Sequence, residues 1–118
     1  MKKVGIIGFG RIGRVHYNIL KGIKGVEILA VADSLADKMS DVFEAYGVEN
    51  FGDDFNAIIN NPEIDTVFVC SPTDTHASVA IAAAKAGKDI FCEKPIDFDI
   101  RRVEEVLDEV KKAGVSFQ

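Results

Sequence analysis

The chain has 118 residues, of which 47% are hydrophobic and 28% charged, a balance typical of one globular domain with its own core. Its net charge of −5, with no basic stripe along the sequence, argues against a nucleic-acid-binding surface. No apolar run approaches the ~18–20 residues of a membrane-spanning helix, and the glycine-interrupted start argues against a signal peptide. We therefore expect a single cytoplasmic domain over residues 1–118, without membrane or nucleic-acid partners.

The chain starts with a short apolar run at residues 4–7, typical of a buried parallel strand, and glycines follow at positions 8, 10 and 13. This G-x-G-x-x-G spacing leads into a helix that we expect to begin near Arg11. Gly8 permits the tight turn, Gly10 leaves room for a pyrophosphate, and Gly13 lets the helix pack closely on the strand. The free N–H groups of the first helical turn would bind phosphate oxygens. The pattern predicts a dinucleotide-binding loop.

A second predicted strand, Val26–Ala32, ends at Asp33, 20 residues after Gly13. At this position a carboxylate can accept hydrogen bonds from both hydroxyls of an adenosine ribose, and it would repel a 2′-phosphate. Ser34 follows, and no arginine stands beside it to reverse that preference. The sequence thus predicts NAD(H) rather than NADP(H) as the cofactor. The alternative is that Asp33 only caps the following helix, since aspartate is a favoured N-cap residue.

Strands and helices alternate over the rest of the chain. Further helices are predicted over residues 36–46, 55–59, 77–84 and 99–113, and further strands over 49–51, 64–70, 89–92 and 115–118. We expect Asp74 or Thr75 to cap the alanine-rich helix over 77–84. The first helix, over 11–23, has an apolar stripe made of Ile12, Val15, Ile19, Leu20 and Ile23.

This alternation predicts an α/β Rossmann fold, a doubly wound parallel sheet with helices on both faces. The expected strand order is 3-2-1-4-5-6, with a ligand crevice at the switch between the first and fourth strands. Cys70 and Cys92 lie in apolar strands and are expected to be buried, without the spacing of a zinc site. Asp53 and Asp54 suit the N-terminus of a short helix, and we predict no metal site.

Three stretches together resemble one family of enzymes: residues 8–16 (GFGRIGRVH), residues 70–76 (CSPTDTH) and Glu93-Lys94-Pro95. They are similar to the glucose–fructose oxidoreductase, inositol dehydrogenase and rhizopine catabolism family (Gfo/Idh/MocA), whose members are NAD(P)-dependent dehydrogenases of sugars and polyols. The likeness covers the whole chain, and the run Phe91-Cys92-Glu93-Lys94-Pro95 is most similar to the inositol dehydrogenases. The resemblance implies an oxidoreductase that oxidises a secondary alcohol of a cyclitol or sugar with NAD.

The resemblance also implies roles for matching residues. Lys94 would be the catalytic residue that hydrogen-bonds the substrate hydroxyl, and Lys94–Pro95 would be a cis peptide. From spacing alone, Lys94 could equally be a surface lysine in a turn before proline. The implied cofactor-binding residues are Gly8, Phe9, Gly10, Arg11, Ile12 and Gly13 at the pyrophosphate, Asp33 and Ser34 at the adenosine ribose, and Ser71, Pro72, Thr73, His76, Glu93 and Lys94 in the nicotinamide half of the crevice. The alternative for Thr73 and His76 is a helix cap and a solvated histidine.

Members of this family carry a second domain with an Asp-x-x-x-His pair for proton relay, and residues 1–118 contain no such pair. We therefore expect the chain to bind NAD(H) but to transfer hydride poorly by itself, because substrate positioning is missing. The face that would meet the second domain is expected to be uncovered, which favours self-association. Two alternatives are a non-catalytic NAD(H)-sensing module and an S-adenosylmethionine methyltransferase. The Glu93-Lys94-Pro95 motif argues against both.

Overall fold

In the computed structural model, which describes residues 1–118, strands and helices alternate along the chain. The strands are β1 (Lys2–Ile7), β2 (Val26–Ala32), β3 (Phe51–Gly52), β4 (Thr66–Val69) and β5 (Asp89–Cys92). The helices are α1 (Arg11–Lys21), α2 (Ser40–Tyr46), α3 (Asn56–Ile59), α4 (Thr73–Lys85) and α5 (Ile100–Ala113), with the 3₁₀ turn η1 (Ala36–Lys38) before α2. None of the helices combines the length and the apolar content that a membrane crossing needs.

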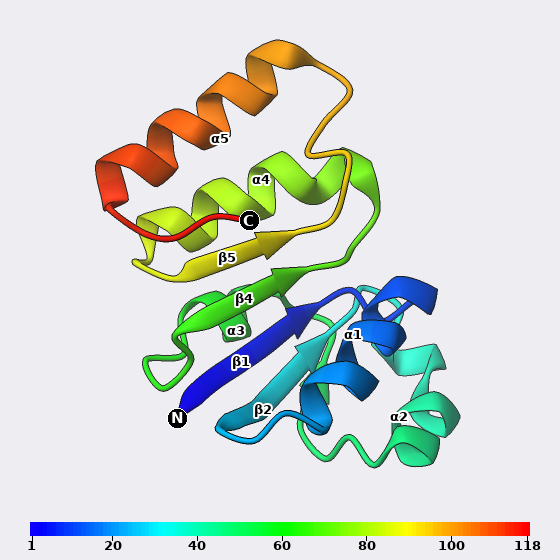
Figure 1. Cartoon of the computed structure of the whole chain (residues 1–118). Coiled ribbons are helices and arrows are strands. Elements are labelled where there is room, and N and C mark those ends of the chain that lie inside the picture. Colours follow the sequence, from blue (N-terminus) through cyan, green and yellow to red (C-terminus); the bar gives the residue numbers. More distant parts are fainter.

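The five strands form one parallel sheet in the order β3-β2-β1-β4-β5. Figure 1 shows the neighbours β2, β1, β4 and β5 of this sheet. β1 lies at the centre of the sheet because it is apolar on both faces, and Val4, Ile6 and Ile7 are all buried. This order confirms the predicted Rossmann arrangement for the first five strands. The order reverses between β1 and β4, so the carboxyl ends of these two neighbours mark the expected crevice.

The predicted sixth strand, over residues 115–118, is not formed. These residues run alongside β5, but their pairing consists of one isolated bridge between Ile90 and Phe117. Gln118 N–H donates to Ile90 O (2.9 Å) and Ile90 N–H donates to Ser116 O (2.8 Å). A strand needs consecutive paired residues, and this segment has a single one. The sheet therefore has five strands, and the prediction of a sixth is wrong.

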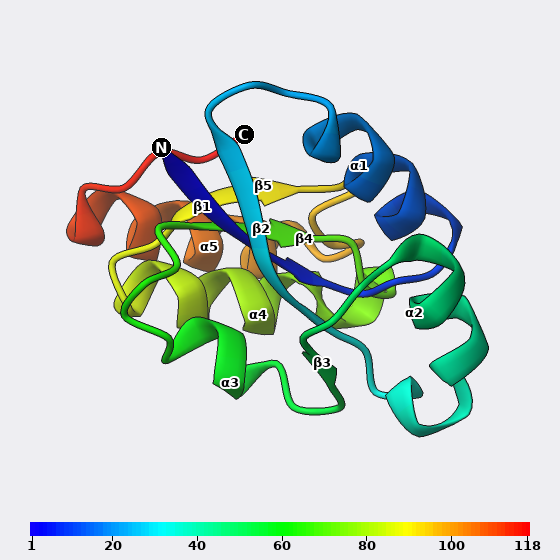
Figure 2. The same cartoon turned by 90° about the horizontal axis from the view of Figure 1, so that it is seen from below.

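Helices cover both faces of the sheet, and each face has its own core. Figure 2 shows α1 and α4 on opposite sides of the sheet. On the side of α3, α4 and α5 the core includes Ile7, Ile58, Val67, Val69, Ala80, Ile90 and Val106. On the side of α1 and α2 it includes Val4, Ile6, Phe9, Tyr17, Leu20, Val31 and Phe43.

Helix α1 turns a different face to the sheet from the one predicted. Its buried residues are Gly13, Tyr17 and Leu20, so only Leu20 of the predicted apolar stripe is buried. The other members of the stripe are exposed: Ile12, Val15, Ile19 and Ile23. The reason is the contact of α1 with the glycine turn, since a Cβ on Gly13 would overlap the carbonyl oxygen of Gly8. The helix is therefore oriented with Gly13 and the positions that share its face against the sheet.

Two other helices begin differently from their predictions. The helix predicted over residues 36–46 is divided into η1 and α2, which meet at Met39. Helix α4 begins at Thr73, directly after Pro72, so the prediction that Asp74 or Thr75 caps it is wrong. Pro72 lacks an N–H and has a φ of −56°, which suits the residue just before a helix. Thr75 Oγ1 instead donates back to Pro72 O (2.6 Å).

Helix α5 is close to its prediction. Asp99 caps it, since its Oδ1 accepts a hydrogen bond from Arg101 N–H (2.9 Å). Val106 is buried, whereas the next residue, Leu107, is 48% exposed and does not belong to the buried face. The helix packs on α4, which covers β4 and β5.

A buried lysine ties the beginning of β5 to the turn between α3 and β4. Lys88 is 7% exposed, and its ammonium donates to Asn61 O (2.7 Å) and Ile64 O (2.6 Å). A buried cation is tolerated when its donors reach acceptors, and two carbonyl oxygens serve that purpose here. This contact lies at the amino end of β5, opposite the edge where the predicted motifs gather.

Candidate functional site

Four turns follow the carboxyl ends of β1, β2, β4 and β5 and meet at one edge of the sheet. In the strand register, Ile7 pairs with both Ala32 and Val69, and Val69 pairs with Cys92. The parallel strands therefore end side by side. The segments that follow them are the glycine loop, the turn at Asp33, the turn at residues 71–73 and Glu93-Lys94-Pro95. The structure thus brings together all the motifs that the sequence singled out.

The glycine loop has the geometry that its spacing predicts. Gly8 has a φ of +95°, and a Cβ there would overlap the backbone of Cys70 and Ser71. At Gly13 the absence of a Cβ lets α1 start directly against the turn. Around Gly10, no atom lies within 4 Å of the position that a Cβ would take, which leaves open space beside the backbone. This is the space that a pyrophosphate needs for its approach.

The N-terminus of α1 faces this open space. Gly10 is the N-cap residue, and the first hydrogen bond of the helix runs from Arg14 N–H to Gly10 O (3.0 Å). The N–H groups of residues 11–13 therefore have no partner within the helix. Arg11 and Ile12 are exposed beside them. Free N–H groups at the positive end of an 11-residue helix form a site for an anion.

Arg14 and Phe9 have structural roles in the loop that the sequence did not indicate. The Arg14 side chain folds back, and its Nε donates to Phe9 O (3.0 Å). The Phe9 ring is fully buried, with its centroid 5.5 Å from that of Tyr17 and 5.4 Å from that of Phe43. The Phe9 side chain is therefore an anchor of the loop in the core between α1 and α2, and only its backbone is left for other contacts.

Asp33 binds the glycine loop from the end of β2. Its Oδ2 accepts a hydrogen bond from Phe9 N–H (2.8 Å), and its Oδ1 accepts one from Leu35 N–H (2.9 Å). The second bond shows that the alternative interpretation, a cap for the following turn, describes part of what Asp33 does. The first bond places the carboxylate directly beside the loop, where the ribose interaction was predicted. Ser34, next to it, is exposed.

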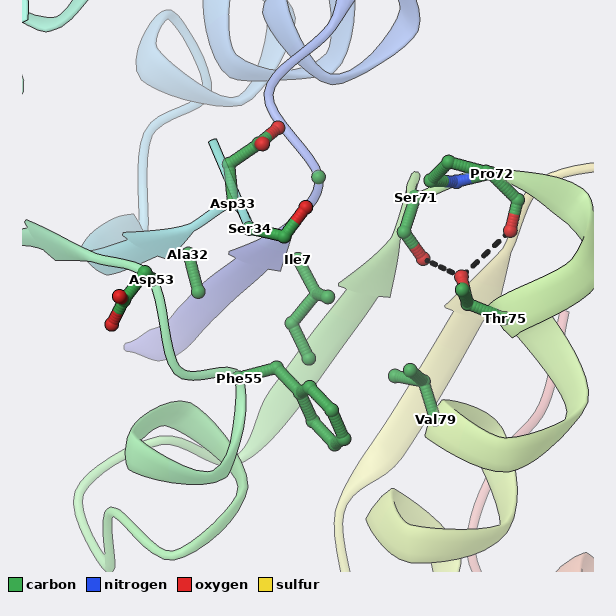
Figure 3. Close-up of a pocket in the computed structure, with 11 residues that line it drawn as sticks. Ile7, Ala32, Asp33, Ser34, Asp53, Phe55, Ser71, Pro72, Thr75 and Val79 are labelled. Atoms are coloured by element: carbon green, nitrogen blue, oxygen red, sulfur yellow. Dashed lines mark hydrogen bonds between the residues drawn. The ribbon is translucent and has the colours of Figure 1, made fainter. Parts of the chain in front are cut away.

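A cavity of about 220 Å³ opens between the ends of β1, β2 and β4 (Figure 3). In Figure 3 the side chains of Phe55 and Val79 point toward one another below Ile7. Thr75 Oγ1 forms a hydrogen bond with Ser71 Oγ (2.7 Å). Phe55, Thr75 and Val79 had no signal in the sequence, because only the fold places them here. The lining residues are Ile7, Gly8, Ala32, Asp33, Ser34, Asp53, Phe55, Ser71, Pro72, Thr75 and Val79.

The turn after β5 carries Lys94. Glu93 N–H donates to Val69 O (3.1 Å), and the Glu93 carboxylate contacts Nε2 of His16 on α1. The Lys94–Pro95 peptide is cis, which confirms that prediction. Lys94 is exposed and forms no ion pair, so its ammonium is free to meet a ligand in the crevice.

His76 lies inside the molecule between two of the turns. It is 2% exposed, with Nδ1 2.8 Å from Pro95 O and Nε2 2.6 Å from Ser71 O. The alternative of a solvated histidine is therefore wrong. Thr73, predicted beside it, is the half-buried first residue of α4.

The two thiols lie next to this edge of the sheet. Burial raises the pKa of the Cys70 thiol to about 12 and that of the Cys92 thiol to about 11, and the nearby Glu93 carboxylate acts in the same direction. Because the thiolate is the reactive form, neither cysteine is a nucleophile at neutral pH. No three His, Cys, Asp or Glu side chains gather in a way that could hold a metal ion.

Comparison with known proteins identifies the family. A family model described as an oxidoreductase family with an NAD-binding Rossmann fold (GFO_IDH_MocA) matches residues 2–118. The chain belongs to this family. The match confirms the resemblance that the three sequence stretches indicated. It also confirms NAD as the cofactor of the fold, which Asp33 and the glycine loop predicted.

Relatives of this Gfo/Idh/MocA domain include several inositol dehydrogenases. The myo-inositol 2-dehydrogenase of Thermotoga maritima is 41% identical over 113 residues, which are 96% of this chain and 34% of that protein. The inositol 2-dehydrogenase of Rhizobium meliloti is 44% identical over 105 residues, which are 89% of this chain and 31% of that protein. The chain spans about a third of the length of these curated relatives.

Solved structures agree with the sequence comparison. A probable dehydrogenase from Thermotoga maritima has a TM-score of 0.92 at 40% identity, over 98% of this Gfo/Idh/MocA chain and 34% of that one. The scyllo-inositol dehydrogenase of Lactobacillus casei, solved with bound NAD(H) and scyllo-inositol, has a TM-score of 0.89 at 32% identity, over 100% of this chain and 35% of that one.

Proposed function

We propose that this chain is the NAD(H)-binding part of a dehydrogenase that oxidises a secondary alcohol of an inositol or a related polyol or sugar. The observation that carries the proposal is the meeting of the glycine loop, Asp33 and Lys94 at one edge of the sheet. The similarity to inositol dehydrogenases supports the substrate class. A cytoplasmic location stays a prediction.

The residues present fit a dinucleotide. The open space at Gly10 and the free N–H groups of residues 11–13 would hold the pyrophosphate. Asp33, with Ser34 beside it, would accept hydrogen bonds from the hydroxyls of the adenosine ribose. The cavity below it, lined by carbon atoms of Phe55 and Val79, suits the flat adenine ring. On this placement, Glu93 and Lys94 would border the nicotinamide half.

Lys94 is the residue to which we assign the proton transfer. Bound NAD⁺ supplies the hydride acceptor. Lys94 Nζ, in its neutral form, would hydrogen-bond the substrate hydroxyl and take the proton that leaves it. Glu93, bound at both its backbone and its carboxylate, would keep this turn at the end of β5.

The 118-residue chain is expected to bind NAD(H) without oxidising polyols, because the substrate has little surface to hold it against Lys94. The measurement is NADH formation, followed by its absorbance, in the presence of NAD⁺ and myo- or scyllo-inositol. Robust turnover would contradict this expectation. NADH binding that changes the affinity of the chain for another protein, without polyol oxidation, would instead favour the sensing-module alternative.

An apolar surface beside α1 bears on self-association. The rings of Phe68 and Phe91 stack with centroids 4.8 Å apart and are half-buried, and Ile12, Val15 and Ile19 are exposed nearby on α1. We propose that this surface is part of the uncovered face through which self-association was predicted. Sedimentation velocity at rising concentration measures it, and a monomer at every concentration would contradict it.

Removing the Asp33 carboxylate is expected to weaken NADH binding about 30-fold, because hydrogen bonds to a charged acceptor are lost at the ribose. The Asp33→Ala variant also frees Phe9 N–H, which loosens the loop. Affinity for NADPH should rise, since no negative charge then opposes the 2′-phosphate. Calorimetric titration with NADH, NADPH and S-adenosylmethionine measures all three affinities.

Two further variants separate the charge from the loop contact. Asp33→Asn keeps an acceptor for Phe9 N–H but removes the charge, so it should gain NADPH affinity with a smaller loss of NADH affinity. Asp37→Ala removes the same charge from an exposed position in η1 and should leave both affinities unchanged. Binding of S-adenosylmethionine in place of NADH, or no change in Asp33→Ala, would contradict the proposed function.

A further inference from the structure

The turn that carries Lys94 has few polar contacts with the rest of the molecule. At the end of the segment 94–98, Asp97 Oδ1 accepts a local hydrogen bond from Asp99 N–H. Only one other hydrogen bond joins this segment to the rest of the chain. That bond joins Pro95 O to Nδ1 of His76, at 2.8 Å. Before the segment, Glu93 N–H is fixed at the end of β4. Hydrogen bonds therefore hold the Lys94 turn on both sides, and Ile96 adds an apolar contact with the core.

The second ring nitrogen of His76 reaches the opposite turn. Nε2 lies 2.6 Å from Ser71 O, so one imidazole joins the turn after β4 to the turn after β5. A carbonyl oxygen can only accept a hydrogen bond, whereas a neutral imidazole has one donor and one acceptor nitrogen. Both contacts are hydrogen bonds only when both nitrogens carry protons. With a neutral ring, a nitrogen lone pair would face a carbonyl oxygen at a site that is 2% exposed to water.

We infer that His76 is held as an imidazolium ion that clamps these two turns together and thereby positions Lys94. His76 is a positioning residue, because both of its nitrogens are used by the backbone and none is left for the cofactor. Burial of the ring and its location near the N-terminus of α4 both disfavour a positive charge, and two short hydrogen bonds from a charged donor oppose these effects. The functional part of the inference rests on the proposed role of Lys94 beside the nicotinamide.

The protonation of the ring can be measured directly on the unmodified chain. In ¹⁵N-labelled protein at neutral pH, both ring nitrogens of His76 are expected to show the signals of protonated nitrogens, with no pyridine-type signal. The chain has two histidines, so the His76→Gln variant assigns the resonances. A neutral ring, with one protonated and one unprotonated nitrogen, would overturn the clamp. This measurement needs no ligand and no core substitution.

The positioning role is tested with two ligands, NADH and ADP-ribose, which lacks the nicotinamide. The His76→Phe variant is expected to bind NADH about tenfold more weakly while keeping its affinity for ADP-ribose. The Lys94 turn loses its only hydrogen bond to His76, whereas the Ser71-Pro72 turn keeps its two hydrogen bonds with Thr75. The backbone amide signal of Lys94 should shift. His76→Gln, which can reach one carbonyl, should have a smaller effect and serves if the Phe variant does not fold.

Lys88→Met is the matched control. It removes another buried cation that donates to two backbone carbonyls, at the opposite end of β5. It should lower the melting temperature but leave the ratio of the two affinities unchanged. Equal losses for both ligands in His76→Phe would contradict the positioning role. If the wild-type chain binds neither ligand while its His76 ring is doubly protonated, the proposed function fails and the clamp stands.

Discussion

Replacing Phe9 by alanine is expected to lower the free energy of unfolding by about 4 kcal/mol, although Phe9 lies in a loop. Its ring is fully buried, and its centroid lies 5.5 Å from that of Tyr17, 5.4 Å from that of Phe43 and 5.4 Å from that of Tyr46. Aromatic pairs of this kind add about 0.5–1.5 kcal/mol each beyond the area they bury. The cavity would open between two helices that pack on a common sheet, so the surroundings can close it only in part.

Thermal unfolding, followed by circular dichroism, measures the loss. For a domain of this size the melting temperature should fall by about 15 °C. Phe98→Ala is the matched control: it is the same substitution at a side chain that is 84% exposed, and it should change the unfolding free energy by less than about 0.5 kcal/mol. Equal effects of the two variants would contradict the anchoring role of Phe9.

Two alanine substitutions within the glycine loop are expected to affect different properties, one the stability of the fold and the other the binding of NADH. Gly13→Ala should lower the unfolding free energy by about 3 kcal/mol, because the new methyl group would overlap the backbone oxygen of Gly8, which cannot move without the turn. Gly10→Ala should change it by less than about 1 kcal/mol, since nothing lies near its Cβ and its φ is −75°. The same methyl group would occupy the approach of the pyrophosphate and weaken NADH binding about tenfold or more.

The pair of glycine variants is its own control, because each changes one hydrogen atom into a methyl group three residues from the other. Chemical denaturation measures stability and calorimetric titration measures NADH affinity. The expected pattern is a stability loss in Gly13→Ala and a binding loss with normal stability in Gly10→Ala. A large stability loss in Gly10→Ala would contradict the open space beside that residue, and normal NADH binding by Gly10→Ala would contradict the placement of the pyrophosphate.

The sequence was sufficient for the fold and for the edge where the motifs meet. Buried parallel strands have near-continuous apolar runs, so Val26–Ala32 and Asp89–Cys92 were predicted at their observed bounds. Because parallel strands end at a common edge, any residue that directly follows a strand, such as Asp33 or Glu93, is predicted at the site. The sixth strand failed because apolar character predicts a strand but does not determine how many of its residues pair.

The sequence was insufficient where contacts between distant elements decide the outcome. The apolar stripe of α1 gave the wrong face, because the close contact of Gly13 with Gly8 outweighs the burial of Ile12 or Ile19. Phe55 and Val79 follow no motif and reach the cavity only through the packing of their helices. His76 lies in a stretch that was singled out, but its two carbonyl partners belong to turns 19 and 5 residues away, and no local pattern indicates such contacts.

The raised pKa values of Cys70 and Cys92 give this protein an internal reporter of its own opening. In the folded chain both thiols are protonated, Cys92 is buried and Cys70 is half-buried, so an alkylating reagent at neutral pH reacts with them slowly. In an opened chain they regain the acidity of ordinary cysteines and react. The cysteines lie at the ends of β4 and β5, so the labelling rate measures how often this part of the sheet separates. The stability variants described above can therefore be ranked in native buffer, without denaturant and without an engineered label.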